Sequence, residues 1–219
     1  MIFDAVVLAG GRASRLGGLA KPLLLGYGGE RLLDIATSAA SAAARIVVVG
    51  DVPPEAGILV TREDPPLSGP VSALAAGWAA LADGPSPFTL VLASDLPLIG
   101  PAVDALLAAV DPACIAADGD AKDGLIAIDD GGRDQYLLGL YSTQALAARL
   151  RQAPRMGGSM HALVDGLRLQ RVSVPVGSTA DVDTWADAEL LGVERMDRGQ
   201  LDRGRRDDSP GFTRREDRA

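Results

Sequence analysis

The chain has 219 residues, of which 47% are hydrophobic and 23% are charged, proportions typical of a globular protein. Its formal net charge of -8 argues against a general nucleic-acid-binding protein, which needs a basic face. A single cysteine, Cys114, excludes an intrachain disulfide and a thiolate zinc cluster, and a single histidine, His161, leaves one candidate for a histidine-based relay or metal site.

The first half of the chain alternates short apolar runs with alanine-rich segments. The apolar runs are rich in β-branched residues, which predicts buried strands at Asp4–Ala9, Arg45–Asp51, Gly57–Asp64 and Pro87–Ile99, the last running into an acidic turn. The segments between them have helical spacing, which predicts helices at Glu30–Ala44, Gly69–Ala82 and Pro101–Val110. This alternation indicates βαβ units and a parallel sheet covered on both faces.

The second half of the chain is less regular. We expect strands at 114–118, 124–129, 136–142 and 167–176, and helices at 143–153, around His161 and at 183–192. From Glu194 onward the apolar pattern gives way to arginines interleaved with acids. The sequence therefore predicts one domain over residues 1–193 and a charged, disordered tail over residues 194–219.

A loop rich in glycine and arginine, GGRASRLGGLAK, follows the first predicted strand. It matches neither the dinucleotide fingerprint G-x-G-x-x-G nor the P-loop G-x-x-x-x-G-K-[ST]. One stretch of ten residues in this otherwise acidic chain carries three cations, Arg12, Arg15 and Lys21. Together with the N–H groups of the glycines, these cations can neutralise a triphosphate. The loop predicts a site for a specific anion, and a surface loop without a ligand is the alternative.

Acidic residues follow two other predicted strands. Asp64 ends the third strand, and Asp95 follows the fourth in the stretch SDLP. Ligands of open parallel sheets bind beyond the carboxyl ends of the strands, so we expect these acids to converge with the loop. Such a carboxylate can hold Mg²⁺ against nucleotide phosphates, whereas an isolated aspartate there is otherwise a turn residue or a helix cap. The cationic loop favours the metal interpretation of Asp95.

The stretch LAGGRASRLGGLAK resembles the signature L-A-G-G-x-S/A-x-R-M/L-G-x(3)-K of nucleotidyltransferases, and among them most of all the molybdenum cofactor guanylyltransferases. The resemblance continues in RED-x(4)-GPVSALAAG, ASDLPLI, LLGLYS and DVDTWADAE, and so covers residues 1 to about 192. It implies a Rossmann-like, three-layer α/β/α nucleotidyltransferase fold with a mainly parallel sheet. It also implies transfer of GMP from GTP to the terminal phosphate of molybdenum-molybdopterin, with Mg²⁺ as cofactor and pyrophosphate as the second product.

The expected nucleotide site combines the loop with positions matched by the resemblance. The backbone at Leu8–Gly10 matches the segment that meets guanine, and Gly11, Arg15 and Lys21 match triphosphate contacts. Asp64 matches an acid that helps to hold the nucleotide, and Asp51 is a candidate for a ribose or base contact. With Arg12 from the loop, the expected nucleotide-binding residues are Leu8, Ala9, Gly10, Gly11, Arg12, Lys21, Asp51, Asp64 and Asp95.

The resemblance also implies metal and acceptor positions. Asp95 matches the magnesium ligand, and Asp183 falls where relatives carry a second ligand near the metal, often asparagine. Gly69 and Pro70 match a turn near the pterin, and Asp181, also often asparagine in relatives, is grouped with them as an acceptor contact. The attacking group is a phosphate oxygen that is already anionic, so Arg15, Lys21 and Asp95 are the expected catalytic residues, which hold and neutralise charge.

Two other functions remain open at this point. One is a sibling nucleotidyltransferase: a CTP-dependent molybdopterin cytidylyltransferase, whose motif usually reads L-A-A-G, or an enzyme for a sugar phosphate or another small phosphate. The other is a non-catalytic nucleotide-binding module.

No apolar run reaches the roughly 18 residues of a membrane span and no secretory signal is visible. We therefore expect a cytoplasmic enzyme that hands its product to cofactor-inserting chaperones or apo-molybdoenzymes and binds neither nucleic acid nor membranes.

Overall fold

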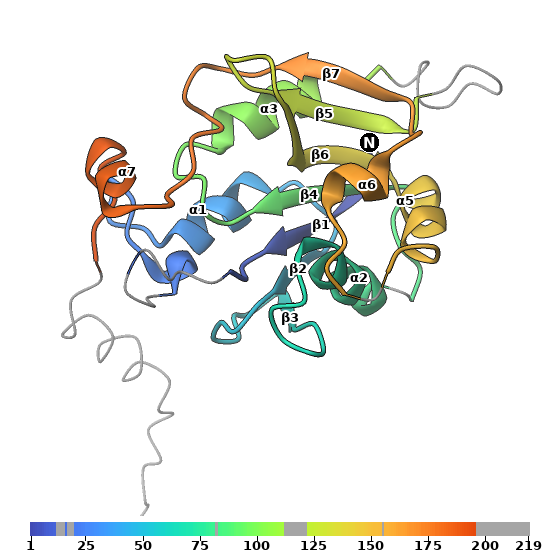
Figure 1. Cartoon of the computed structure of the whole chain (residues 1–219), viewed down its shortest axis with the longest axis horizontal. Coiled ribbons are helices and arrows are strands. Elements are labelled where there is room, and N and C mark those ends of the chain that lie inside the picture. Colours follow the sequence, from blue (N-terminus) through green and yellow to red (C-terminus); the bar gives the residue numbers. More distant parts are fainter. Residues whose placement is uncertain (12–15, 17–19, 82, 112–121, 155, 196–219) are drawn as a thin grey trace, which may run out of the picture.

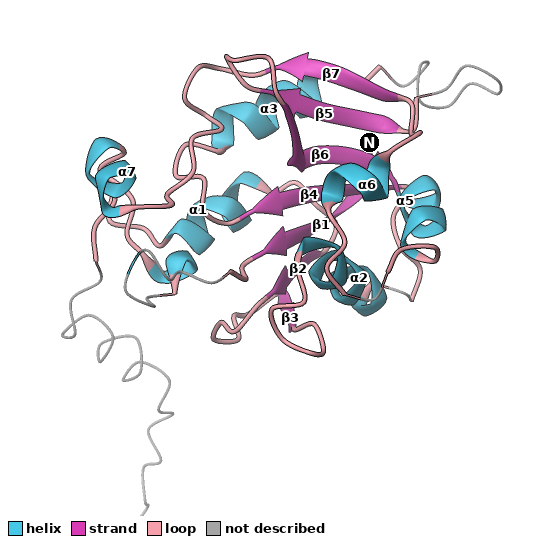
Figure 2. Ribbon diagram, in the orientation of Figure 1, coloured by secondary structure: helices cyan, strands magenta, loops and turns pink. Residues whose placement is uncertain are grey.

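A seven-stranded sheet of order β3-β2-β1-β4-β6-β5-β7 forms the centre of the described chain (Figures 1 and 2). The computed structural model describes residues 1–11, 16, 20–81, 83–111, 122–154 and 156–195. In this sheet β6 runs antiparallel to both neighbours and the other pairs are parallel, which confirms the predicted mainly parallel sheet. The strands are β1 (Phe3–Leu8), β2 (Ile46–Val49), β3 (Ile58–Thr61), β4 (Phe88–Ala93), β5 (Gly124–Ile128), β6 (Asp134–Ser142) and β7 (Leu169–Ser173).

Helices cover both faces of the sheet, as the three-layer prediction requires (Figure 2). The central strand β1 is buried along its whole length and alternates between the two layers. Phe3, Ala5 and Val7 pack with α1 (Leu32–Ala39) and α3 (Gly100–Ala108). Val6 and Leu8 pack with α2 (Pro70–Ala80), α5 (Thr143–Leu150) and α6 (Met160–Val164). Within the described ranges, none of the helices is both long and apolar enough to cross a membrane.

Besides the hydrophobic cores on the two faces of the sheet, a small hydrophobic cluster, here called the end cluster, joins the two ends of the domain. The 3-10 helix η2 (Lys21–Leu23) and α7 (Trp185–Leu190) lie beside it. Leu25 and Glu194 exchange backbone hydrogen bonds of 2.9 and 2.8 Å, and the Arg195 guanidinium lies 4.1 Å from the centre of the Trp185 ring. Glu194 and Arg195, which the sequence predicts to lie in the tail, thus contact the domain. The buried members of this end cluster are Leu16, Leu24, Leu32, Val182, Ala188 and Val193.

The predicted elements that fall on described residues correspond to observed ones. Most are shorter than expected, whereas β6 begins earlier, at Asp134. The helix expected at Glu30–Ala44 is α1, which ends at Ala39. The alanines beyond it turn instead, so that the N–H of Ala44 reaches the carbonyl of Phe3 at 2.8 Å and leads the chain into β2. The strand expected at 114–118 and the remainder of the predicted tail, 196–219, lie outside the described residues.

Gly77 allows α2 to pack closely on the sheet. A Cβ atom at this position would lie 2.5 Å from Cγ1 of Val6 and 2.8 Å from Cγ2 of Val49. Both distances are far inside van der Waals contact, and valine side chains on strands are stiff. The absence of a side chain at Gly77 therefore sets the distance between α2 and strands β1 and β2.

We expect Gly77→Ala to destabilise the protein. Within a helix, alanine is more favourable than glycine by about 1 kcal/mol in free energy. Crowding a packed core lowers the free energy of unfolding by about 1–3 kcal/mol, and here the added methyl group would clash with two stiff side chains. Urea unfolding measures the difference. The control is Gly100→Ala in α3, where an added Cβ has no heavy atom within 4 Å and stability should be unchanged or higher. Equal stability of Gly77→Ala and wild type would contradict this account of the packing.

Candidate functional site

A pocket of about 600 Å³ opens at the carboxyl edge of the parallel strands. The strand order reverses between β1 and β4, and a crevice is expected beyond such a switch point. Segments far apart in the sequence meet here: the ends of β1, β2, β3 and β4, the start of α2, and η2. The lining residues are Leu8, Ala9, Gly10, Gly11, Ala20, Lys21, Pro22, Gly50, Asp51, Arg62, Glu63, Leu67, Gly69, Pro70, Ala73, Ala93, Ser94, Asp95 and Leu137.

The chain leaving β1 presents its backbone to this pocket. The carbonyl of Leu8 accepts a hydrogen bond from the N–H of Ser94 at 3.1 Å, and the N–H of Ala9 donates to Val49 at 2.8 Å. The next residues, Gly10 and Gly11, are exposed. A Cβ atom on Gly10 would have no heavy atom within 4 Å. A ligand can therefore approach the backbone at Gly10 directly.

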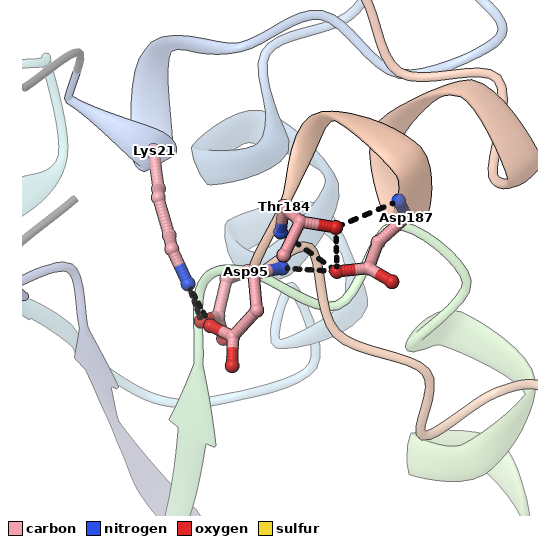
Figure 3. A network of polar contacts seen from close by, with 5 residues as sticks. Lys21, Asp95, Thr184 and Asp187 are labelled. Carbon is pink, nitrogen blue, oxygen red and sulfur yellow. Dashed lines mark hydrogen bonds and ion pairs between the residues drawn. The ribbon is translucent and has the colours of Figure 1, made fainter. Parts of the chain in front are cut away.

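Lys21 forms ion pairs with two aspartates at the edge of the pocket (Figure 3). Its ammonium nitrogen lies 2.5 Å from Oδ1 of Asp183 and 3.3 Å from Oδ2 of Asp95. Burial opposes the charge of Lys21, but the hydrogen bond to Asp183 and the charges of Asp95 and Asp183 outweigh it and raise the pKa of Lys21. The lysine therefore stays protonated, and its positive charge lies between two carboxylates.

A third carboxylate, that of Asp181, completes an acidic cluster. Oxygens of Asp95, Asp181 and Asp183, one from each residue, lie within 4.8 Å of one another. The pKa of Asp181 is raised, mainly by loss of solvent around its carboxylate and to a smaller extent by the negative charges of Asp183 and Asp95. Hard divalent cations prefer such oxygen donors, and a cation here would also relieve the repulsion. The donor set thus fits Mg²⁺.

Two features hold the 181–183 segment in place. The side chain of Val182 is fully buried in the end cluster, and its N–H donates to the carbonyl of Asp95 at 3.1 Å. Oδ2 of Asp187 accepts hydrogen bonds from the N–H groups of Asp183 and Thr184, at 3.2 and 2.7 Å, and from the Thr184 hydroxyl at 2.8 Å (Figure 3). Asp187 is thus a positioning residue that the sequence analysis missed, although Thr184-x-x-Asp187 is a capping-box pattern before a helix.

The structure brings together many of the sequence-predicted site residues. Asp64 is exposed and is not among the lining residues, whereas its neighbour Glu63 lines the pocket. Asp181 and Asp183 lie in the acidic cluster with Asp95. Arg12 and Arg15 lie outside the described residues. The predicted residues that line the pocket are Leu8, Ala9, Gly10, Gly11, Lys21, Asp51, Gly69, Pro70 and Asp95.

Two charged lining residues, Arg62 and Glu63, were not singled out from the sequence. Arg62 places Nη1 3.4 Å from a carboxylate oxygen of Asp51, so these two side chains form one ion pair on the pocket wall. Glu63 is buried, and its Oε1 accepts a hydrogen bond from the N–H of Leu67 at 2.8 Å. Glu63 therefore shapes the turn that leads to Gly69. No local pattern in the sequence marks this contact, because it depends on how the turn after β3 folds.

Known proteins resemble this chain in sequence and in fold. A family model described as MobA-like NTP transferase domain matches residues 5–172. The probable molybdenum cofactor guanylyltransferase of Mycobacterium avium (strain 104) is 29% identical over 202 residues, which cover 89% of this chain and 98% of the relative.

Two solved structures illustrate the likeness in fold. Molybdopterin-guanine dinucleotide biosynthesis protein A from Archaeoglobus fulgidus has a TM-score of 0.61 at 20% identity, covering 86% of this chain and 96% of that one. The 2-C-methyl-D-erythritol 4-phosphate cytidylyltransferase from Thermus thermophilus has a TM-score of 0.57 at 20% identity, covering 87% and 97%. Both confirm the predicted nucleotidyltransferase fold.

We expect Val182→Ala to destabilise the protein, because the segment that carries two of the acids is anchored by this side chain. Removing buried methyl groups and leaving a cavity costs about 1.5–3 kcal/mol at such a site. Thermal unfolding measures the loss. The matched control is Val176→Ala, whose side chain is 81% exposed and should tolerate the change. The anchor would be disproved if the two variants melted at the same temperature.

Proposed function

The chain belongs to the family of MobA-like NTP transferase domains, which are nucleotidyltransferases, and from this membership we propose that it transfers GMP from GTP to the terminal phosphate of molybdenum-molybdopterin. One observation carries the proposal: the exposed backbone after β1, the cation Lys21 and the carboxylate Asp95 meet at one pocket. The curated guanylyltransferase that is 29% identical supports the choice of nucleotide and acceptor.

The proposed reaction is an in-line displacement at phosphorus. An oxygen of the acceptor's terminal phosphate forms a bond to the α-phosphorus of GTP, the bond from that phosphorus to the bridging oxygen of the β-phosphate breaks, and pyrophosphate leaves. The attacking oxygen is anionic near neutral pH, so the step needs no general base. His161 accordingly has no part in it; its ring lies edge-on to Tyr136, with 5.5 Å between ring centres, beside a separate hollow of about 220 Å³.

The residues of the site would then hold two anions and neutralise charge. Lys21 and Arg15 act on the triphosphate, with Arg12 in the same loop. Asp95 and Asp183 hold Mg²⁺, which when bound supplies charge neutralisation at the α-phosphate and the leaving pyrophosphate. The acceptor is assigned to Gly69, Pro70 and Asp181, and the remaining nucleotide contacts to Leu8, Ala9, Gly10, Gly11, Asp51 and Asp64.

We place this reaction in the cytoplasm and infer a transient contact with cofactor-inserting chaperones or apo-molybdoenzymes. A labile cofactor is poorly released into solvent, so direct transfer to the next protein protects it. The test adds an excess of unlabelled free cofactor while the enzyme passes radiolabelled product to an apo-molybdoenzyme. If the label incorporated into the apo-molybdoenzyme is not reduced by the unlabelled cofactor, the transfer is direct and such a contact exists.

Pyrophosphate release with a panel of nucleotides and acceptors tests the proposal. We expect release with GTP and molybdenum-molybdopterin in the presence of Mg²⁺, and a loss of at least about 100-fold in Asp95→Ala, because charge in the transition state is no longer balanced. The control is Asp104→Ala, which removes an exposed acid on α3 and should keep full activity. Wild-type activity of Asp95→Ala would rule out its role.

The second candidate is a cytidylyltransferase, which the likeness in fold to the Thermus thermophilus enzyme makes worth testing. Release with CTP and methylerythritol phosphate, and none with GTP and molybdenum-molybdopterin, would establish that function instead. No release with any pair would indicate a non-catalytic nucleotide-binding module.

We expect Gly10→Ala to reduce the use of GTP relative to CTP. The added methyl group projects where a purine would lie against the backbone, and a pyrimidine needs less room. Since this Cβ meets no protein atom within 4 Å, the melting temperature should not change. One methyl-sized clash in a pocket is worth about tenfold or more in kcat/KM. An unchanged ratio of kcat/KM for GTP and CTP would show that the base lies elsewhere.

A further inference from the structure

Lys21 lies where the proposed metal ion would lie. Its ammonium group contacts one oxygen each of Asp95 and Asp183, the two acids assigned to the metal. Mg²⁺ binds oxygen ligands at about 2.0–2.1 Å. An ion bound to both carboxylates at that distance would therefore compete with the lysine for the same oxygens and repel its charge.

The acids of this site are held firmly, whereas the lysine has a long side chain. The backbone of Asp183 is held by the buried Val182 and by the hydrogen bonds of Asp187, and the carbonyl of Asp95 accepts from the N–H of Val182. The backbone of Lys21 is also anchored, because its carbonyl accepts from the N–H of Leu24 at 3.0 Å. The backbone is thus anchored on both sides of the ion pairs, and an exchange needs only side-chain rotation, above all of the four-carbon side chain of Lys21, which also lines the pocket.

We propose that Lys21 is a built-in counter-ion that closes the cation site in the nucleotide-free chain. When a nucleoside triphosphate enters the pocket, its phosphates take up the ammonium group, and the divalent cation replaces it between Asp95 and Asp183. The nucleotide and the metal then bind cooperatively, and the free chain has little affinity for the metal. This inference rests on the proposed function for its metal ion.

The opposite role for Lys21 is also physically reasonable and has the opposite consequence. The lysine would hold the acids in position while the metal binds their outward oxygens together with Asp181. Its removal would then weaken metal binding in the free chain. The sign of the change in metal affinity therefore distinguishes the two roles.

The experiment measures Mn²⁺ binding to the full chain without nucleotide, from the electron paramagnetic resonance signal of free Mn²⁺. We expect Lys21→Met to bind Mn²⁺ at least about tenfold more tightly than wild type, because a competing charge has been removed from the same oxygens. Arg62→Met is the matched control: it removes a cation from the same pocket wall, but that cation pairs with Asp51. Its Mn²⁺ affinity should stay close to that of wild type.

A double variant locates the bound ion. Adding Asp183→Asn to Lys21→Met should abolish the gain, which would place the ion on the cluster. Unchanged or weaker binding in Lys21→Met, an equal gain in Arg62→Met, or tight binding by the wild type would each overturn the proposal. Lys21→Gln replaces Lys21→Met if circular dichroism shows that the latter is unfolded.

The test is independent of the acceptor. If Lys21→Met does not gain Mn²⁺ affinity while the wild type still releases pyrophosphate from GTP and molybdenum-molybdopterin, the counter-ion role fails and the proposed function stands. If the gain is observed but no substrate pair releases pyrophosphate, the competition between Lys21 and the cation stands and the proposed function fails.

Discussion

One backbone hydrogen bond connects the two parts of the acidic cluster: the N–H of Val182 donates to the carbonyl of Asp95. Three carboxylates within 4.8 Å of one another repel, so charge alone would separate them. They are held together by the burial of Val182 and by the capping interactions of Asp187, neither of which depends on a bound ligand. The chain therefore builds a concentration of negative charge before any substrate arrives.

The same end cluster couples this negative charge to the positive charge of the glycine-rich loop. Leu16 from that loop and Leu24 from the chain after η2 share the cluster with Val182, and Leu25 pairs with Glu194. Lys21 and Asp183 are 162 residues apart, yet their side chains form an ion pair. The cation and the acids can meet only when both ends of the domain have packed, so the site depends on the end cluster as well as on the sheet edge.

The sequence predicted the sheet, both helical layers and the edge at which residues converge, because hydrophobic periodicity and strand ends determine these features. It did not distinguish Glu63 from Asp64, since which of two consecutive acids faces the pocket depends on how the turn folds after β3. In the structure Glu63 turns inward to accept from Leu67, and Asp64 stays exposed. The pairing of Lys21 with Asp183 was also out of reach, because it arises from tertiary packing and leaves no local pattern.

The balance of charge explains why a lysine belongs among these acids. The chain has a formal net charge of -8, and a triphosphate and a phosphorylated acceptor would add further negative charge at one pocket. Aspartates at 181 and 183, where the resembling family often has asparagine, increase the repulsion that an entering anion meets. A cation held in advance at the cluster reduces that repulsion and is available to the phosphates. Burial disfavours an unpaired Lys21, and the three clustered carboxylates repel one another when no cation lies among them. When Lys21 turns to a phosphate, the acids therefore need another cation, and the binding of nucleotide and of metal becomes linked through a single side chain.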